Sequence, residues 1–175
     1  MADNIPDKIL DAKEGRFPTT LEGIKQFYDE WAPTYEKLTR HGFKNIDGVD
    51  ISTESLKICK EGGLYRRLIC DRIGTNKLDI NDDSYDGLIL CGALLKGHLN
   101  LGCFPELIRI VKPGGPIIFS VSSNSKDTFD KFKDGKFESD LQELVCKGLW
   151  VKEANELIPD WIFNRPGHQY VYKVV

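Results

Sequence analysis

Residues 45–50 have the sequence NIDGVD, which is typical of a short buried strand and ends in the carboxylate of Asp50. A helix signal follows, because Ser52 or Thr53 can cap a helix that runs to about Glu61 and two glycines after it supply a stop. In nucleotide-binding α/β folds, the second strand ends in such an acid, which accepts hydrogen bonds from ribose hydroxyls. The segment, extended by Ile51, therefore predicts a strand in an α/β domain.

The sequence before this strand lacks the loop that should precede it. In such folds, a first strand leads into a G-x-G loop and a helix before the acid-bearing strand begins. Residues 35–43 (YEKLTRHGF) contain neither an apolar strand nor a G-x-G. We therefore expect a sheet truncated at its first strand and weak or absent binding of a nucleotide cofactor.

Further strands and helices follow in alternation, which favours a mostly parallel sheet with an antiparallel C-terminal hairpin. We expect the strands at 45–51 and 85–91 to become neighbours or near neighbours, since nothing remains to lie between them. We assign residues 1–20 to a polar arm and residues 21–175 to one domain, which begins with an aromatic helix face over 21–35. The expected strands are 65–70, 85–91 and 117–121; the expected helices are 104–111 and 138–147; the expected hairpin strands are 150–157 and 169–174, joined by 158–168.

Composition excludes several classes of function. The formal net charge is −3, and no basic stripe is present, so we expect no nucleic-acid binding. No run approaches the roughly 18 apolar residues of a membrane span. Five cysteines and three histidines are scattered without C-x-x-C or ligand spacing, so we expect reduced thiols and no metal site. These features predict a cytoplasmic monomer.

Several segments, in this order, resemble the class I S-adenosylmethionine-dependent methyltransferases, and more narrowly the methyltransferase-like protein 27 group. The resemblance implies a Rossmann-like sheet, S-adenosylmethionine as cofactor, and a small-molecule or protein methyl acceptor. The segments that carry it are YDEWAPTY (28–35), GVDIS (48–52), YDGLILCGAL (85–94), PEL (105–107), VKPGG (111–115) and FNRPG (163–167).

The resemblance also implies roles for six residues. Asp50 would accept the ribose hydroxyls and Ile51 would flank the adenine; the alternative for Asp50 is that it helps to cap the helix after it. Asp71 and Arg72 follow the third strand, where the family contacts the adenine amino group, or they form an ordinary surface turn. Cys91 and Gly92 would end the fourth strand beside the methionyl part of the cofactor. His98 lies in the next loop, where we expect solvent exposure rather than catalysis.

One departure from the family lies between Lys37 and Leu38. A helix, the first strand and the glycine loop are missing there, about 40–50 residues by the size of such a unit. Three interpretations follow: a methyltransferase, a non-catalytic truncated isoform that binds a partner, or a nicotinamide-dependent dehydrogenase, which shares the acidic second strand.

Overall fold

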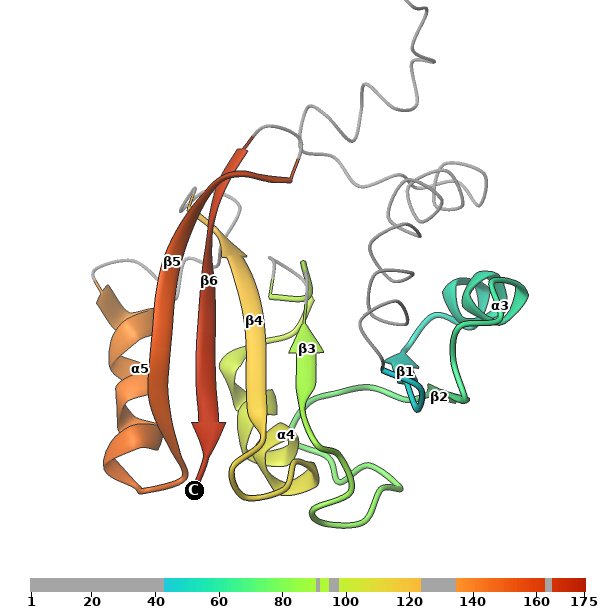
Figure 1. The fold of residues 1–175 in the computed structure, drawn as a ribbon, viewed down its shortest axis with the longest axis horizontal. Helices are drawn as coiled ribbons and strands as arrows, with labels where there is room; N and C mark the ends of the chain where they lie inside the picture. Colours follow the sequence, from blue (N-terminus) through green and yellow to red (C-terminus); the bar gives the residue numbers. More distant parts are fainter. Residues whose placement is uncertain (1–42, 91, 95–97, 124–134, 163–164) are drawn as a thin grey trace, which may run out of the picture. The chain divides into compact units, whose positions relative to one another are not determined.

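The computed structural model describes residues 43–90, 92–94, 98–123, 135–162 and 165–175. The chain divides into two compact units, Met1–Arg72 and Ile73–Val175. Each unit has a sheet of its own, with two strands in the first and four in the second (Figure 1). The predicted arm over 1–20 and the predicted helix over 21–35 lie outside the described residues. The assignment of 21–175 to one domain stays a prediction.

The described part of the first unit is a strand–helix–strand motif. Strand β1 (Asp47–Asp50) and strand β2 (Arg67–Cys70) pair in parallel, and helix α3 (Thr53–Glu61) connects them. An ion pair fastens the start of this ladder, because Arg66 donates from Nε and NH2 to the two carboxylate oxygens of Asp47 at 2.9 and 2.6 Å. The predicted strands are thus confirmed, each shorter than expected.

Helix α3 begins and ends as its sequence predicts. The hydroxyl of Ser52, the N-cap residue, accepts a hydrogen bond from the Ser55 N–H at 3.1 Å. After Gly62 at the C-cap, Gly63 has φ +65°, a conformation that glycine adopts without a steric penalty. Leu56 supplies the buried apolar contact of the helix.

The second unit contains a mixed sheet with strand order β3-β4-β6-β5. Strands β3 and β4 are parallel, and β6 is antiparallel to both of its neighbours, β4 and β5. The sheet thus combines a parallel pair with the predicted antiparallel C-terminal hairpin. The strands are β3 (Leu88–Leu90), β4 (Pro116–Ser122), β5 (Trp150–Ile162) and β6 (Arg165–Val174); the helices are η1 (Leu101–Cys103), α4 (Phe104–Ile110) and α5 (Lys136–Cys146).

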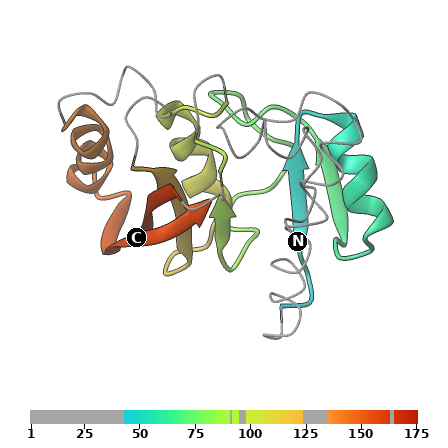
Figure 2. The ribbon, with the colours of Figure 1, turned by 90° about the horizontal axis from the view of Figure 1, so that it is seen from above.

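Both longer helices of this unit lie on one face of its sheet (Figure 2). Phe119 of β4 stands at the centre of that face, with the Phe104 ring of α4 at 4.9 Å and the Phe137 ring of α5 at 6.5 Å. The indole of Trp150 is fully buried beside them, and its N–H donates to the Leu141 carbonyl of α5. This aromatic cluster is the core of the second unit.

The turn between α4 and β4 requires its glycines. Gly114 has φ +82°. A Cβ atom at Gly115 would lie 2.6 Å from Cγ1 of Val111 and 2.8 Å from the carbonyl oxygen of Asp86. The predicted KPGG turn is therefore confirmed, and close packing as well as backbone conformation explains it.

The hairpin is longer than expected. Strands β5 and β6 run to Ile162 and from Arg165, so the predicted connection over 158–168 is wrong. At the tip, a Cβ atom at Gly167 would lie 2.5 Å from Cγ of Trp161, so the indole packs directly on the glycine backbone. Pro159 is compatible with this extension because it falls in the register shift between Ile158 and Ile162, and proline within sheets is found at edge strands and bulges.

Among the described strands, β1 pairs with β2, and β3 pairs with β4, so β1 and β3 do not pair with each other. The expectation that they are neighbours or near neighbours stays a prediction. A membrane-crossing helix, which needs length and apolar surface together, does not occur among the described residues.

Candidate functional site

Four predicted site residues meet at the carboxyl ends of β1 and β2. The N–H of Asp71 donates to the Asp50 carbonyl at 3.2 Å, so the ends of the two strands stay in register. Beside them, the carbonyl of Ile51 accepts a weak hydrogen bond from the Cys70 thiol at 3.7 Å. In open parallel sheets, ligands bind outside these carboxyl ends. The first unit therefore presents Asp50, Ile51, Asp71 and Arg72 at the edge where a nucleoside is expected.

One oxygen of the Asp50 carboxylate binds the backbone, and the other is available to a ligand. Its Oδ1 atom accepts a hydrogen bond from the Ser52 N–H at 2.7 Å, which supports the start of α3. Its Oδ2 atom has no hydrogen-bond partner among the described residues. The carboxylate is half-buried. Both interpretations from the sequence are thus compatible, because one oxygen fixes the side chain while the other faces no competitor.

A thiol lies within the field of this carboxylate. Partial burial, and secondly the negative charge of Asp50, raise the pKa of the Cys59 thiol above its ordinary value. The thiol is therefore neutral at physiological pH. It is a poor nucleophile in that form, because the thiolate is the reactive species.

Ile51 and the turn after β2 offer different surfaces. The side chain of Ile51 is 68% exposed, although it directly follows the half-buried strand β1. Asp71 accepts a hydrogen bond at Oδ1 from the Arg72 N–H at 2.7 Å, so its carboxylate stabilises its own turn. An apolar surface for a base and a polar turn therefore stand side by side.

The remaining predicted residues belong to the second unit. Gly92 follows β3 with φ +64°, which allows the backbone to turn where a side chain would be strained. Cys91 lies outside the described residues. His98 is exposed, as expected. Three or more His, Cys, Asp or Glu side chains do not gather as a possible metal site anywhere in the described part of the chain.

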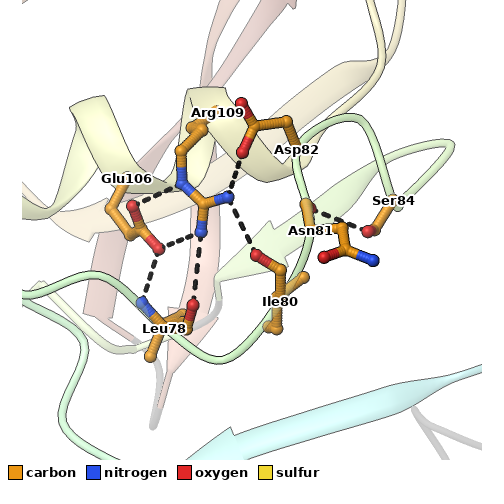
Figure 3. A network of polar contacts seen from close by, with 7 residues as sticks. All are labelled: Leu78, Ile80, Asn81, Asp82, Ser84, Glu106 and Arg109. Atoms are coloured by element: carbon orange, nitrogen blue, oxygen red, sulfur yellow. Dashed lines mark hydrogen bonds and ion pairs between the residues drawn. The ribbon is translucent and has the colours of Figure 1, made fainter.

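The second unit contains a polar network that we did not predict from the sequence (Figure 3). Glu106 of α4 is buried and accepts hydrogen bonds from the Leu78 N–H at 2.7 Å and from Nε of Arg109 at 2.8 Å. Arg109 also donates to the Ile80 carbonyl at 2.8 Å and pairs with Asp82. The network binds the loop that leads into β3 to helix α4.

The guanidinium of Arg109 shifts the pKa values of the carboxylates in this network. Hydrogen bonds from Arg109 hold the pKa of Glu106 and of Asp82 below their ordinary values. The two carboxylates in turn raise the pKa of Arg109. The only local signal in the sequence was the spacing of Glu106 and Arg109, one helical turn apart. Their loop partners are more than 25 residues away.

Comparison with known proteins identifies the family of this chain. A family model described as a methyltransferase domain matches residues 32–119, half of the chain. Human methyltransferase-like protein 27 is 31% identical over 114 residues, which cover 65% of this chain and 45% of that protein. The chain thus spans less than half the length of this relative.

Solved structures show the same fold at low identity. The PH0226 protein of Pyrococcus horikoshii OT3 matches with a TM-score of 0.58 and 20% identity, over 81% of this chain and 76% of that one. A SAM-dependent methyltransferase from Aquifex aeolicus matches with a TM-score of 0.56 and 15% identity, over 89% and 99% of the two chains. Neither the family nor these structures favours the dehydrogenase alternative. The chain belongs to the methyltransferase domain family, with the Rossmann-like methyltransferase fold and a relationship to the methyltransferase-like protein 27 group.

Proposed function

We propose that this chain is an S-adenosylmethionine-dependent methyltransferase that holds the nucleoside part of its cofactor at the carboxyl ends of β1 and β2. One observation carries the proposal: Asp50 keeps Oδ2 without a partner among the described residues, while Ser52 fixes Oδ1 at 2.7 Å. A carboxylate held in this way is ready to accept hydrogen bonds from ribose hydroxyls. The exposed side chain of Ile51 beside it suits the face of an adenine.

The other predicted residues complete the proposed arrangement. Asp71 and Arg72 would face the adenine amino group from the turn after β2. Gly92, with its positive φ, allows close approach of the backbone at the end of β3. S-adenosylmethionine supplies an electrophilic methyl group when bound. The task of the protein is to align an acceptor with it, and much of the rate enhancement can come from this positioning. The acceptor is a small molecule or a protein side chain.

Affinity for the cofactor is expected to be low. The backbone amides of a glycine-rich loop would hold the carboxylate end of the cofactor, and residues 35–43 supply no such loop. We therefore expect weaker binding than in a version that carries the corresponding block of methyltransferase-like protein 27 between Lys37 and Leu38.

Isothermal titration with S-adenosylmethionine tests the proposal. Asp50→Asn keeps an oxygen for the Ser52 N–H but removes the charge, so the variant should fold and bind more weakly. Glu61→Gln, at the exposed end of α3, is the matched control and should bind like the unmodified chain. Equal affinities for all three proteins would refute the ribose assignment. If neither the unmodified chain nor the version with the block binds S-adenosylmethionine, the assignment of this cofactor is refuted.

A second function rests on a different observation. Residues 35–43 contain neither an apolar strand nor the G-x-G loop that would hold the cofactor. A non-catalytic isoform that binds a partner is therefore the alternative proposal. Binding of S-adenosylmethionine only by the version with the restored block would favour it. A cytoplasmic location, a monomeric state and the lack of nucleic-acid binding remain predictions. Imaging in cells tests the location, and experiments on the purified protein test the other two.

A further inference from the structure

His168 lies at the end of the second sheet where parallel strands place their ligands. It pairs with Val121, one residue before β4 ends, and with Leu157 of β5. Gly92 follows β3 at the same end, since Leu90 pairs with Phe119 of β4. With one strand between them, the backbones of β3 and β6 are about 10 Å apart. A ligand at the end of β3 would thus lie within reach of groups on β6.

A directed chain of hydrogen bonds fixes the imidazole. Nδ1 of His168 lies 3.2 Å from Oδ1 of Asn155. Burial, and secondly the charge of Glu138, raise the pKa of the Tyr170 phenol, and a hydrogen bond from the Asn155 side chain acts in the opposite direction, as a donor to the phenol oxygen does. The hydroxyl donates to Oε1 of Glu138 at 3.2 Å. Each donor in this series of hydrogen bonds has one acceptor, and the series ends at the carboxylate of Glu138.

The direction of the chain sets the tautomer of His168. Because the Asn155 amide donates to Tyr170, its oxygen is the atom that faces the imidazole, and Nδ1 must carry the proton. Nε2 then has its lone pair free and finds no hydrogen-bond partner among the described residues. The side chain is half-buried, so a ligand can approach Nε2.

A β-bulge brings Asn155 into this position. The register of β5 against β6 shifts between Lys152 and Ala154, and after the shift Asn155 pairs with Tyr170. In the register before the shift, Asn155 would be on the opposite face of the sheet, because a slip of one residue reverses every side chain. Bulges often re-aim side chains in this way beside active sites.

We propose that His168, oriented by Asn155, is the base that takes the proton from the methyl acceptor. The proposal rests on the proposed methyl transfer. The acceptor carries its reacting atom as N–H or O–H, and a lone pair of that atom forms the new bond to the methyl carbon. The bond between sulfur and this carbon breaks with its electron pair left on sulfur, and the proton passes to Nε2. The product is a methylated acceptor, a neutral thioether and an imidazolium.

The surroundings suit a base that becomes positively charged. On β6 the neighbour is Tyr170, whose ring centre lies 6.2 Å from that of His168 and whose phenol stays protonated because its pKa is raised, chiefly by burial. Glu138 of α5 contributes the negative charge at the far end of the chain. Lys152 of β5 adds a positive charge, because its Nζ atom lies over the Tyr170 ring, 5.7 Å from the ring centre. Val121 and Leu157 add no charge.

The first test reads the tautomer directly. Long-range ¹H–¹⁵N correlation spectra of the full chain at alkaline pH should show His168 with the proton on Nδ1, with its signals identified by their loss in His168→Gln. Asn155→Ala should move His168 to the Nε2–H form, which free histidine favours, and His98→Gln should leave its signals unchanged. An Nε2–H form in the unmodified chain, or an unchanged tautomer in Asn155→Ala, would overturn the inference without any reference to the cofactor.

The second test measures transfer of tritiated methyl groups from S-adenosylmethionine to a panel of small amines and alcohols. His168→Gln should lower the rate by about 10²- to 10⁴-fold, the usual range for a general base. Its affinity for S-adenosylmethionine should be unchanged, and His98→Gln should keep the full rate. Transfer at the full rate by His168→Gln overturns the inference and leaves the proposed function standing; no binding and no transfer by the unmodified chain overturns both.

Discussion

Arg109 and Glu106 lie one helical turn apart on α4, and the guanidinium of the first makes two contacts with the carboxylate of the second. Nε of Arg109 lies 2.8 Å from Oε2 of Glu106, and NH2 contacts Oε1. The Glu106 side chain is 9% exposed and that of Arg109 18%. This pair differs from the other ion pairs on the helices of the second unit because it also holds a loop, through the Leu78 N–H and the Ile80 carbonyl.

Arg109→Met should therefore lower the free energy of unfolding by about 1–3 kcal/mol, because Glu106 and two loop groups lose their partner in a buried place. Urea denaturation followed by circular dichroism measures the change. Lys147→Met is the matched control, since its pair with Glu143 is exposed on both sides and should contribute less than about 0.5 kcal/mol. Equal losses for the two variants would contradict the role given to the network.

Acid should weaken the same network. Hydrogen bonds from Arg109 lower the pKa of Glu106 in the folded chain from its ordinary 4.5, so the unfolded chain binds protons first as the pH falls. The contribution to stability is complete well above pH 4.5 and is lost as the pH falls through the lowered pKa of the folded state. Urea midpoints at pH 7, 5, 4 and 3 test this, and the decline should be smaller in Arg109→Met.

Gly115→Ala should destabilise the second unit by about 1–3 kcal/mol, the usual cost of overpacking. The added methyl group would meet Val111 and the backbone oxygen of Asp86 at less than 3 Å. Gly62→Ala is the control, because Gly62 has φ −69° and its added methyl would touch only backbone oxygens at 3.5 Å or more. That variant should be neutral or slightly more stable. Equal melting temperatures for the two variants would show that the turn can relax.

Unfolding of the whole chain should show low cooperativity. The two sheets share no strand pairing among the described residues, and Phe43, Ile51 and Ile89 are more than half exposed. We expect the van't Hoff enthalpy to fall below the calorimetric enthalpy, together with binding of a hydrophobic dye at room temperature. A sharp two-state melt above about 55 °C, within the usual range for mesophile domains, would contradict this expectation.

Local signals in the sequence predicted the local structure well. The cap at Ser52, the stop after Glu61 and the glycines before Pro116 each depend on neighbouring residues, and the structure confirms the helix and the turn that they predict. The extent of the hairpin was misjudged because Pro159, Pro166 and Gly167 usually indicate a loop. Their tolerance depends on contacts across the hairpin, because Pro159 falls in a register shift and Gly167 packs against the Trp161 indole.

Partners that are distant in sequence were not predictable. Glu106 finds Leu78 across 28 residues, and nothing near either residue announces the contact. His168 and Asn155 are only 13 residues apart, but their meeting depends on a register shift that no turn signal marks.

The contact between Trp161 and Gly167 makes the two positions dependent on each other. With Cγ and Cδ2 of the indole 2.5 Å from where a Cβ would stand, position 167 accepts no larger residue while tryptophan occupies position 161. An alanine at 167 becomes tolerable only if the indole is first replaced by a smaller side chain. The two substitutions are therefore strongly non-additive, and any lineage that alters this tip has one permitted order of steps, with the tryptophan exchanged first.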